Sequence, residues 1–168
     1  PPAEGGDEGG NEGGEVSPPA GGASYVKVTE APTDWTGRYL FVYEEEANAY
    51  VFNGKDAVNG YASAKISGNA FAADSELAAY EVTIETMDGG YALKVGGQYI
   101  SGTSGSNKLN FGNAQSLNTL TLEEDGVKVE SNTSVLRFNA TANQMRFRYY
   151  KAATYGGQKP IQLYKYTE

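Results

Sequence analysis

The stretch from Asp88 to Ser101, DGGYALKVGGQYIS, decides the fold class. It begins with an Asp-Gly turn, continues through the run 91–95, turns again at a Gly-Gly pair and ends in the run 98–101. Short runs rich in aromatic and β-branched residues, separated by Gly, Asn, Asp and Ser, are typical of strands and turns. We therefore predict two strands here and an all-β domain around them.

The same pattern extends from Tyr25 to the end of the chain, and its strands fall into three sets of four. The first set is 38–43, 49–52, a weak pair of segments around 62–71, and 80–85; the second is 91–95, 98–101, 108–111 and 119–123; the third is 127–130, 135–138, 144–150 and 161–166. The alanine-rich piece 72–79 is predicted to be a loop.

The second and third sets align with each other as a weak repeat. Asp88-Gly89 and Asp125-Gly126 each lead into a strand, and Leu-Lys-Val at 93–95 matches Val-Lys-Val at 127–129. One unit of four short strands cannot bury its apolar face alone, whereas three units around an axis can close a barrel without exposed edges. We predict a closed barrel of short antiparallel strands resembling a β-trefoil; a Greek-key β-sandwich would use the same strands.

Residues 1–24 differ in composition from the rest of the chain. They are mainly Gly, Pro and Glu, with five acids and no base, and Val16 is their single sizeable apolar side chain. Such a stretch cannot bury enough surface to offset the entropy of ordering it. We predict a disordered acidic leader or linker over 1–24, acting as a tether, before a single all-β domain over 25–168; the alternative is a plain disordered tail.

The composition excludes several classes of enzyme. The chain has no cysteine and no histidine, which removes thiolate nucleophiles, Ser-His pairs, imidazole bases and ordinary zinc sites. Glycoside hydrolysis by two carboxylates stays open in principle, but nothing in the sequence marks one pair of acids above the rest. We expect no catalytic activity, no cofactor and no metal site.

The net charge of −8 is unevenly spread along the chain. Residues 25–125 hold fourteen acids and six bases, while residues 126–168 hold two acids and seven bases. This distribution argues against a nucleic-acid binder, although the last third can present one basic face. No run of 18 apolar residues exists, so we expect no transmembrane segment. The first residues do not resemble a signal peptide, and we expect the chain to follow a removed export signal or to lie within a longer protein.

The strand 144–151, QMRFRYYK, supplies the first candidate site. Alternation along a strand predicts that Phe147 and Tyr149, with Met145, face the core. It places Arg146, Arg148 and Tyr150 on the opposite face, where a strip of cations and a ring can bind a sugar, a base or an anionic group. The alternative, which we favour, is a solvated face whose arginines pair with nearby carboxylates.

Three aromatic residues in loops complete the candidate list. Trp35 lies in a turn-like setting, Asp34-Trp35-Thr36-Gly37, where an exposed ring can stack on a sugar. The favoured alternative is that Trp35 plugs one end of the barrel. Tyr61 and Tyr155 lie in Gly- and Asn-rich loops and are predicted to be exposed.

Two acidic runs, 44–46 and 123–125, invite a metal interpretation. Neither has the spacing of a calcium loop, and both fall where a hairpin turn is expected. We therefore interpret both as solvated turn charge.

Several segments together resemble a known β-rich module. They are YLFVY at 39–43, GGYALK at 89–94, QYIS at 98–101, RFRYYK at 146–151 and IQLYK at 161–165. The resemblance, over about residues 25–168, is to an accessory module, often C-terminal, of secreted and surface proteins of Bacteroidetes-type gut bacteria. It implies a location at the cell surface or outside the cell and an accessory role, and it carries over no catalytic residue. Lipoproteins of such bacteria often have a Gly- and acid-rich stretch after a lipidated cysteine, which here would lie upstream of residue 1.

These observations favour one function and leave two others open. The favoured function is a non-catalytic module that binds a glycan or another polymeric ligand and so targets or tethers its parent protein. The alternatives are a structural or protein-interaction domain without a small ligand and, more weakly, an accessory contact to nucleic acid. Predicted contributors to binding are Trp35, Tyr61, Arg146, Arg148, Tyr150 and Tyr155.

Overall fold

The structure is a computed structural model that describes residues 23–73 and 75–168. Its elements are β2 (Ser24–Lys27), β3 (Gly37–Glu45), β4 (Asn48–Phe52), β5 (Tyr61–Lys65), β6 (Ala70–Ala72), α1 (Ser75–Ala78), β7 (Val82–Met87), β8 (Gly90–Val95), β9 (Gln98–Thr103), β10 (Ser106–Gly112), β11 (Thr119–Glu123), β12 (Gly126–Ser131), β13 (Ser134–Asn139), β14 (Arg146–Tyr150), the 3-10 turn η2 (Tyr155–Gly157) and β15 (Gln162–Thr167). The all-β class is confirmed, and every predicted strand overlaps a strand of the structure. The predicted leader lies, except for its last two residues, outside the described residues and stays a prediction.

Two local features differ from the prediction. Strand β2 falls where the sequence pattern predicts no strand, and the helical turn α1 lies in the alanine-rich piece predicted to be a loop. Strand β2 has four residues and lies between β15 and β6, which are its partners from distant parts of the chain. Its existence therefore depends on tertiary pairing more than on its own short pattern.

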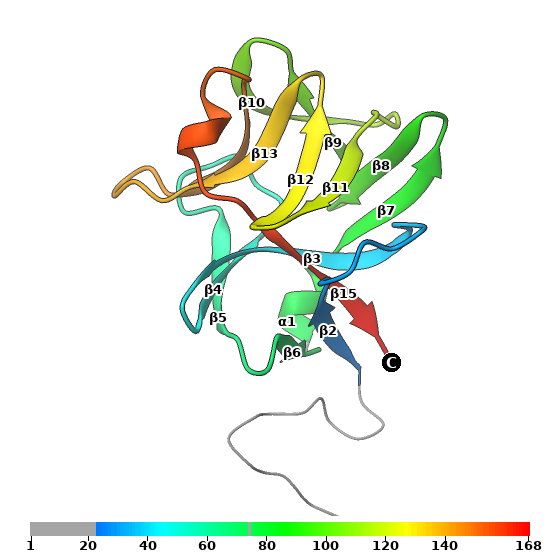
Figure 1. Cartoon of the computed structure of the whole chain (residues 1–168), viewed down its shortest axis with the longest axis vertical. Coiled ribbons are helices and arrows are strands. Elements are labelled where there is room, and N and C mark those ends of the chain that lie inside the picture. The colour runs from blue at the N-terminus through cyan, green and yellow to red at the C-terminus, as the bar shows by residue number, and fades with distance from the viewer. Residues whose placement is uncertain (1–22, 74) are drawn as a thin grey trace, which may run out of the picture.

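The strands form two antiparallel sheets (Figure 1). The larger has the order β10-β9-β8-β7-β3-β15-β2-β6, with β4 beside β3 and β5 beside β4. The smaller has the order β11-β12-β13-β14 and lies above β3 and β15 in Figure 1. The continuous ladders do not close into a barrel, but isolated bridges between Tyr91 and Asn118 and between Val127 and Ile161 join the two sheets.

The central strand β3 is buried on both faces. Its residues Tyr39 and Phe41 belong to the main core, which is built from both sheets and includes Phe52, Leu93, Phe138, Phe147 and Leu163. Leu40 and Val42 point the other way into the second core, which includes Tyr25, Ala49, Val51, Phe71, Leu77 and Tyr164. This double burial accounts for the unbroken apolar run 39–43, which does not alternate with polar residues.

In the second core, β2, β6 and α1 pack against the back of the hairpin β4–β5. Tyr25 of β2, Phe71 of β6 and Leu77 of α1 are all buried there. Full burial of a side chain of this kind contributes about 1.5–3 kcal/mol. Strand β2 is therefore part of the packed domain.

Candidate functional site

The hairpin β4–β5 and the adjoining part of β3 form one patterned face. In the strand register, Tyr43, Tyr50 and Ser63 stand in one row across the three strands. Glu45, Asn48 and Lys65 form the next row on the same side. Because side chains directly opposite each other in an antiparallel pair share a face, rings and polar groups lie side by side here.

Aromatic packing fixes the rings of this face. Tyr50 stacks on Tyr43 at a centroid distance of 5.7 Å and on Phe138 at 5.6 Å, with interplanar angles of 16° and 19°. Tyr61 meets the edge of Tyr50 at 5.0 Å and an angle of 86°. Such pairs are worth about 0.5–1.5 kcal/mol beyond their area burial. Tyr50 and Tyr61 are both half-buried, so their rings are held in place while part of each stays open to solvent.

Polar groups surround the open side of Tyr50. Its hydroxyl donates to Glu45 Oε1 at 3.3 Å, and the Lys65 ammonium donates to Asn48 Oδ1. Burial raises the pKa of the Tyr50 hydroxyl, and the neighbouring Glu45 carboxylate raises it further, so the hydroxyl stays a proton donor at neutral pH.

A shallow hollow of about 380 Å³ lies over these strands. It is lined by Asn48, Ala49, Tyr50, Ser63, Ala64 and Lys65. A fixed ring beside an amide, a hydroxyl and an ammonium group can contact the apolar side of a sugar ring and hydrogen-bond its hydroxyls. We call this set of lining residues, together with Glu45 and Tyr61, the tyrosine hollow.

The predicted site residues do not come together in one place. Tyr61 lies at the start of β5 in the tyrosine hollow, where its side chain is half-buried rather than fully exposed. The sequence missed the other members, although the alternation of Asn48, Tyr50 and Phe52 along one strand could have indicated a shared face.

The structure contradicts the interpretation of Trp35 as an exposed stacking ring. Its side chain is only 5% exposed and belongs to the main core, where its ring lies 6.4 Å from that of Tyr39. The backbone N–H of Trp35 donates to the Tyr91 hydroxyl at 3.2 Å. The favoured alternative, in which the tryptophan fills the interior, fits this burial, because the large apolar ring gains more from the core than from a loop surface.

The predicted exposure of Tyr150 is also wrong, since this side chain is only 4% exposed. Burial raises the pKa of its hydroxyl, while the Asn139 amide and the nearby arginines oppose the rise. Alternation placed Tyr150 correctly on the side opposite Phe147 and Tyr149, which are fully buried. Strand alternation, however, says nothing about whether other segments cover the outer face.

Tyr155 and the two predicted arginines lie around this outer face. The ring of Tyr155 is half-buried, with Lys128 Nζ 5.7 Å and the Arg137 guanidinium 5.3 Å from its centroid. Arg148 Nε lies 3.3 Å from Asp56 Oδ1, which matches the favoured pairing of an arginine with a carboxylate. Arg146 is half-buried and has no ion pair among the described residues.

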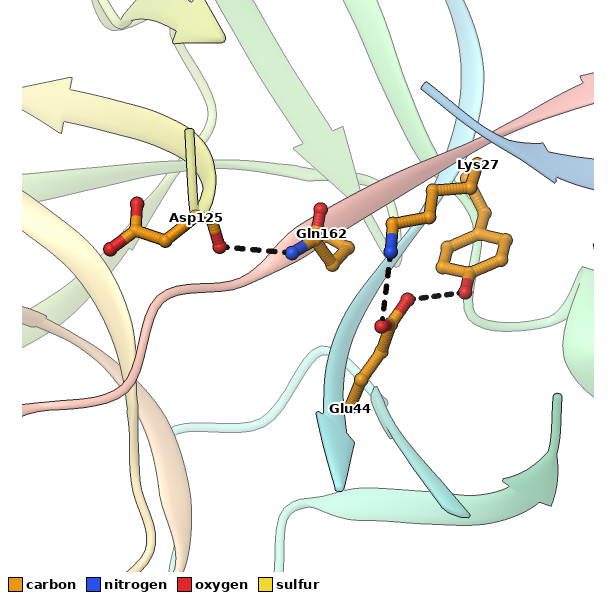
Figure 2. A network of polar contacts seen from close by, with 5 residues as sticks. Lys27, Glu44, Asp125 and Gln162 are labelled. Carbon is orange, nitrogen blue, oxygen red and sulfur yellow. Dashed lines mark hydrogen bonds and ion pairs between the residues drawn. The ribbon is translucent and has the colours of Figure 1, made fainter. Parts of the chain in front are cut away.

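Both acidic runs lie at hairpin turns, as predicted, but each begins within a strand: the first runs from the end of β3 into the turn before β4, and the second from the end of β11 into the turn before β12. Glu44 is nevertheless not solvated turn charge. It accepts a hydrogen bond from Lys27 Nζ at 3.1 Å and another from the Tyr164 hydroxyl, as Figure 2 shows. Alternation turns Glu44 away from Glu45 and toward β2 and β15, where it joins three strands.

The second turn is held by a different contact. Gln162 of β15 donates from Nε2 to the backbone oxygen of Asp125 at 3.0 Å (Figure 2). In the described part of the chain, no group of three or more acidic residues is arranged to hold a metal ion. Among residues 23–73 and 75–168, no helix has the length and apolar character needed to span a bilayer.

Comparisons of the chain with protein-family models, with curated proteins and with solved structures find no match.

Proposed function

We propose that this chain is a non-catalytic extracellular or cell-surface module that binds a glycan or a similar polymer through the tyrosine hollow, and so targets or tethers its parent protein. The supporting observation is the hollow itself, in which the Tyr50 ring is fixed between neighbours while Asn48, Ser63 and Lys65 supply hydrogen-bonding groups. Concave sites with a few convergent polar groups around an apolar surface suit such ligands.

The proposal includes a trefoil arrangement of the strands. The ladders β3–β7, β7–β8, β11–β12 and β15–β3 form two arcs. The bridges Tyr91–Asn118 and Val127–Ile161 lie at the two gaps between the arcs. Three further hairpins, β4–β5, β9–β10 and β13–β14, follow at regular intervals along the chain. Six strands around an axis, with three hairpins at one end, would satisfy all of these pairings.

Two glycines support the same arrangement. A Cβ atom added to Gly90 would lie 2.6 Å from the backbone oxygen of Asn118. A Cβ atom added to Gly126 would lie even closer to the backbone oxygen of Ile161. Each glycine begins a strand at one of the two gaps, at matching places in the second and third sets of strands. Only a residue without a side chain permits the backbones to approach this closely.

The proposed location is the cell surface or the extracellular space. It is supported by the resemblance to accessory modules of secreted Bacteroidetes-type proteins and by the acidic Gly- and Pro-rich composition of residues 1–24. A lipid anchor upstream of residue 1 would fit the same role, with the leader as a spacer.

The test is affinity electrophoresis of the full chain in gels that contain neutral polysaccharides, at two salt concentrations. We expect retardation by at least one polysaccharide, unchanged by salt, because the contacts involve rings and neutral hydroxyls. Tyr50→Ala should weaken binding at least tenfold, while Tyr50→Phe, which keeps the ring, should weaken it about threefold. Tyr99→Ala is the matched control on β9, and it should leave binding unchanged.

The three variants also require a urea unfolding curve, so that loss of the fold is not taken for loss of binding. No retardation by any neutral polysaccharide would contradict the proposal, as would equal losses in Tyr50→Ala and Tyr99→Ala. Either result would favour the structural or protein-interaction domain and direct the search to protein partners. Retardation by single-stranded DNA alone, lost at high salt, would favour the nucleic-acid contact.

A further inference from the structure

The outer face of the four-stranded sheet carries three of the chain's four arginines, Arg137, Arg146 and Arg148. Phe138 on β13 and Phe147 on β14 point into the main core, so the residues next to them along each strand point outward. Across the β13–β14 hairpin, Arg137 stands directly opposite Arg148. The arginines therefore form one compact group, which sequence order alone conceals.

The charges of this group are only partly compensated. Like charges directly opposite each other in a sheet destabilise it. Asp56 pairs with Arg148 at 3.3 Å, and these side chains are 22% and 24% exposed. Arg137 has no carboxylate partner among the described residues; it donates to the backbone oxygen of Gln158 at 3.0 Å and lies over the Tyr155 ring.

Arg146 is the least compensated of the three arginines. Its Nε is buried and finds no hydrogen-bond acceptor in the part of the chain that the structure describes. A buried donor without an acceptor costs about 1–3 kcal/mol, so native proteins rarely leave one unsatisfied. The Arg146 side chain as a whole is only half-buried and has no ion pair among the described residues, so its charge is left for a partner from outside the chain.

A fourth cation borders the group. Lys128 of β12 lies 5.7 Å from the centroid of the Tyr155 ring and 3.9 Å from Glu130. Together the face holds the cations Arg137, Arg146, Arg148 and Lys128 against the paired carboxylates Asp56 and Glu130. Guanidinium groups have planar donor arrays that match carboxylate and sulfate oxygens in pairs.

We propose that this arginine face, formed by Arg137, Arg146, Arg148, Lys128 and Tyr155, binds the sulfate or carboxylate groups of an acidic polysaccharide. The site lies outside the tyrosine hollow and shares none of its residues. Its success or failure is therefore independent of neutral-glycan binding at the hollow.

One observation favours a polysaccharide over a nucleic acid. Single-stranded nucleic acids are held mainly by bases stacked on free rings. Here Tyr150 is buried, and two cations already lie over Tyr155. The face thus offers charge at short range and no stacking platform.

The experiment compares the binding of the full chain to dextran sulfate and to unmodified dextran, which differ only in their oxyanions. We expect binding to dextran sulfate at low salt, weakening as salt rises, and no binding to dextran at this face. Arg146→Gln and Arg137→Gln should each weaken binding about tenfold, the effect of losing one charge-assisted contact. Arg38→Gln is the matched control, since it removes the remaining arginine, which lies on β3 in the other sheet.

Asp56→Asn gives a result in the opposite direction. It removes the carboxylate that competes for Arg148, and it should strengthen dextran sulfate binding about threefold. A chain that had merely lost its fold could not bind more tightly, so this gain distinguishes the proposal from unfolding. Equal weakening by Arg38→Gln and Arg146→Gln would overturn the proposal, because it would indicate unspecific attraction. Tighter binding of single-stranded DNA than of dextran sulfate would overturn the assignment to polysaccharides.

Discussion

The hairpins β4–β5 and β13–β14 pack against each other through aromatic rings, but their opposite faces differ completely. Phe52 meets Phe147 at 5.4 Å, and Tyr50 stacks on Phe138. Behind the first hairpin, the small side chains of Ala49 and its neighbours belong to the second core. Behind the second hairpin lies the arginine face.

This difference follows from what the chain adds to each side. Strand β2, strand β6 and helix α1 cover the back of β4–β5, so that side must be apolar and small. The back of β13–β14 receives the segment between β14 and β15, which contributes Tyr155 and a backbone carbonyl of Gln158. The same strand pattern therefore serves burial in one hairpin and charge in the other. The aromatic rings between the two hairpins belong to the main core that both hairpins share.

The largest effect should come from breaking the aromatic contact that the hairpins share. Phe138→Ala removes a fully buried ring that touches Tyr43, Tyr50 and Phe147. We expect a loss of about 3–5 kcal/mol in the free energy of unfolding, measured with urea. Phe138→Leu keeps most of the volume and should lose much less. A loss below about 1 kcal/mol for the alanine variant would show that the hairpins do not depend on each other.

A smaller loss in the free energy of unfolding should appear at alkaline pH, and the contributions of the two hairpins to it should differ. Burial raises the pKa of the Tyr149 hydroxyl on β14, and burial raises the pKa of Tyr39 on β3 to about 12. A tyrosine whose folded pKa lies above its unfolded value of about 10 binds more protons when folded, so stability falls as pH rises past 10. Each such tyrosine should account for about 1.4 kcal/mol of loss by pH 11.

The matched variants Tyr149→Phe and Tyr50→Phe separate the two hairpins in urea unfolding at pH 9 and pH 11. Tyr149→Phe should remove about 1.4 kcal/mol of the loss, because full burial of the Tyr149 hydroxyl raises its pKa. Tyr50→Phe should remove less of the loss, because the Tyr50 side chain is partly open to water. Equal effects would mean that the hairpins are equally hydrated.

The smallest effect concerns the ion pair that links the β4–β5 loop to the arginine face. A double-mutant cycle with Asp56→Asn and Arg148→Gln should give a coupling energy of about 0.5–1 kcal/mol, since both side chains are partly exposed. Measurement at low and high salt should show the coupling shrinking with ionic strength. A coupling of zero would mean that Asp56 contributes nothing to positioning Arg148. The aromatic contacts alone would then link the two hairpins.

Residue alternation made part of this structure predictable. It assigned Phe147 and Tyr149 to the core and Arg146 to the opposite side, because the two-residue period of a strand needs no tertiary information. It also placed Tyr150 on the side opposite Phe147, but alternation does not show that distant segments cover this side and bury the ring. Alternation does not apply to Trp35, which lies outside the strands. The same limit applies to β2, which pairs with strands far along the chain.

The two functional faces illustrate why sites are harder to predict than strands. Arg137 stands opposite Arg148 only because of the register across the hairpin, which the sequence of the connecting loop 140–145 does not reveal. Tyr50 is one of thirteen tyrosines, and its neighbours Ser63 and Lys65 come from the next strand. Strand boundaries follow from the local sequence, whereas the tyrosine hollow and the arginine face depend on which strands pair and in which register.

The pairing of β2 with β15 also has a mechanical consequence. Ser24 stands opposite Thr167, so the start of β2 and the end of β15 lie side by side at one end of the same ladder. Hydrogen bonds of an antiparallel pair run perpendicular to the strands. A pull that separates these two ends would load the bonds one after another, as a zipper opens, and the seam would yield at low force. The contact of Lys27 with Glu44, at the far end of β2, is the last to be loaded and sets where such an opening would stop.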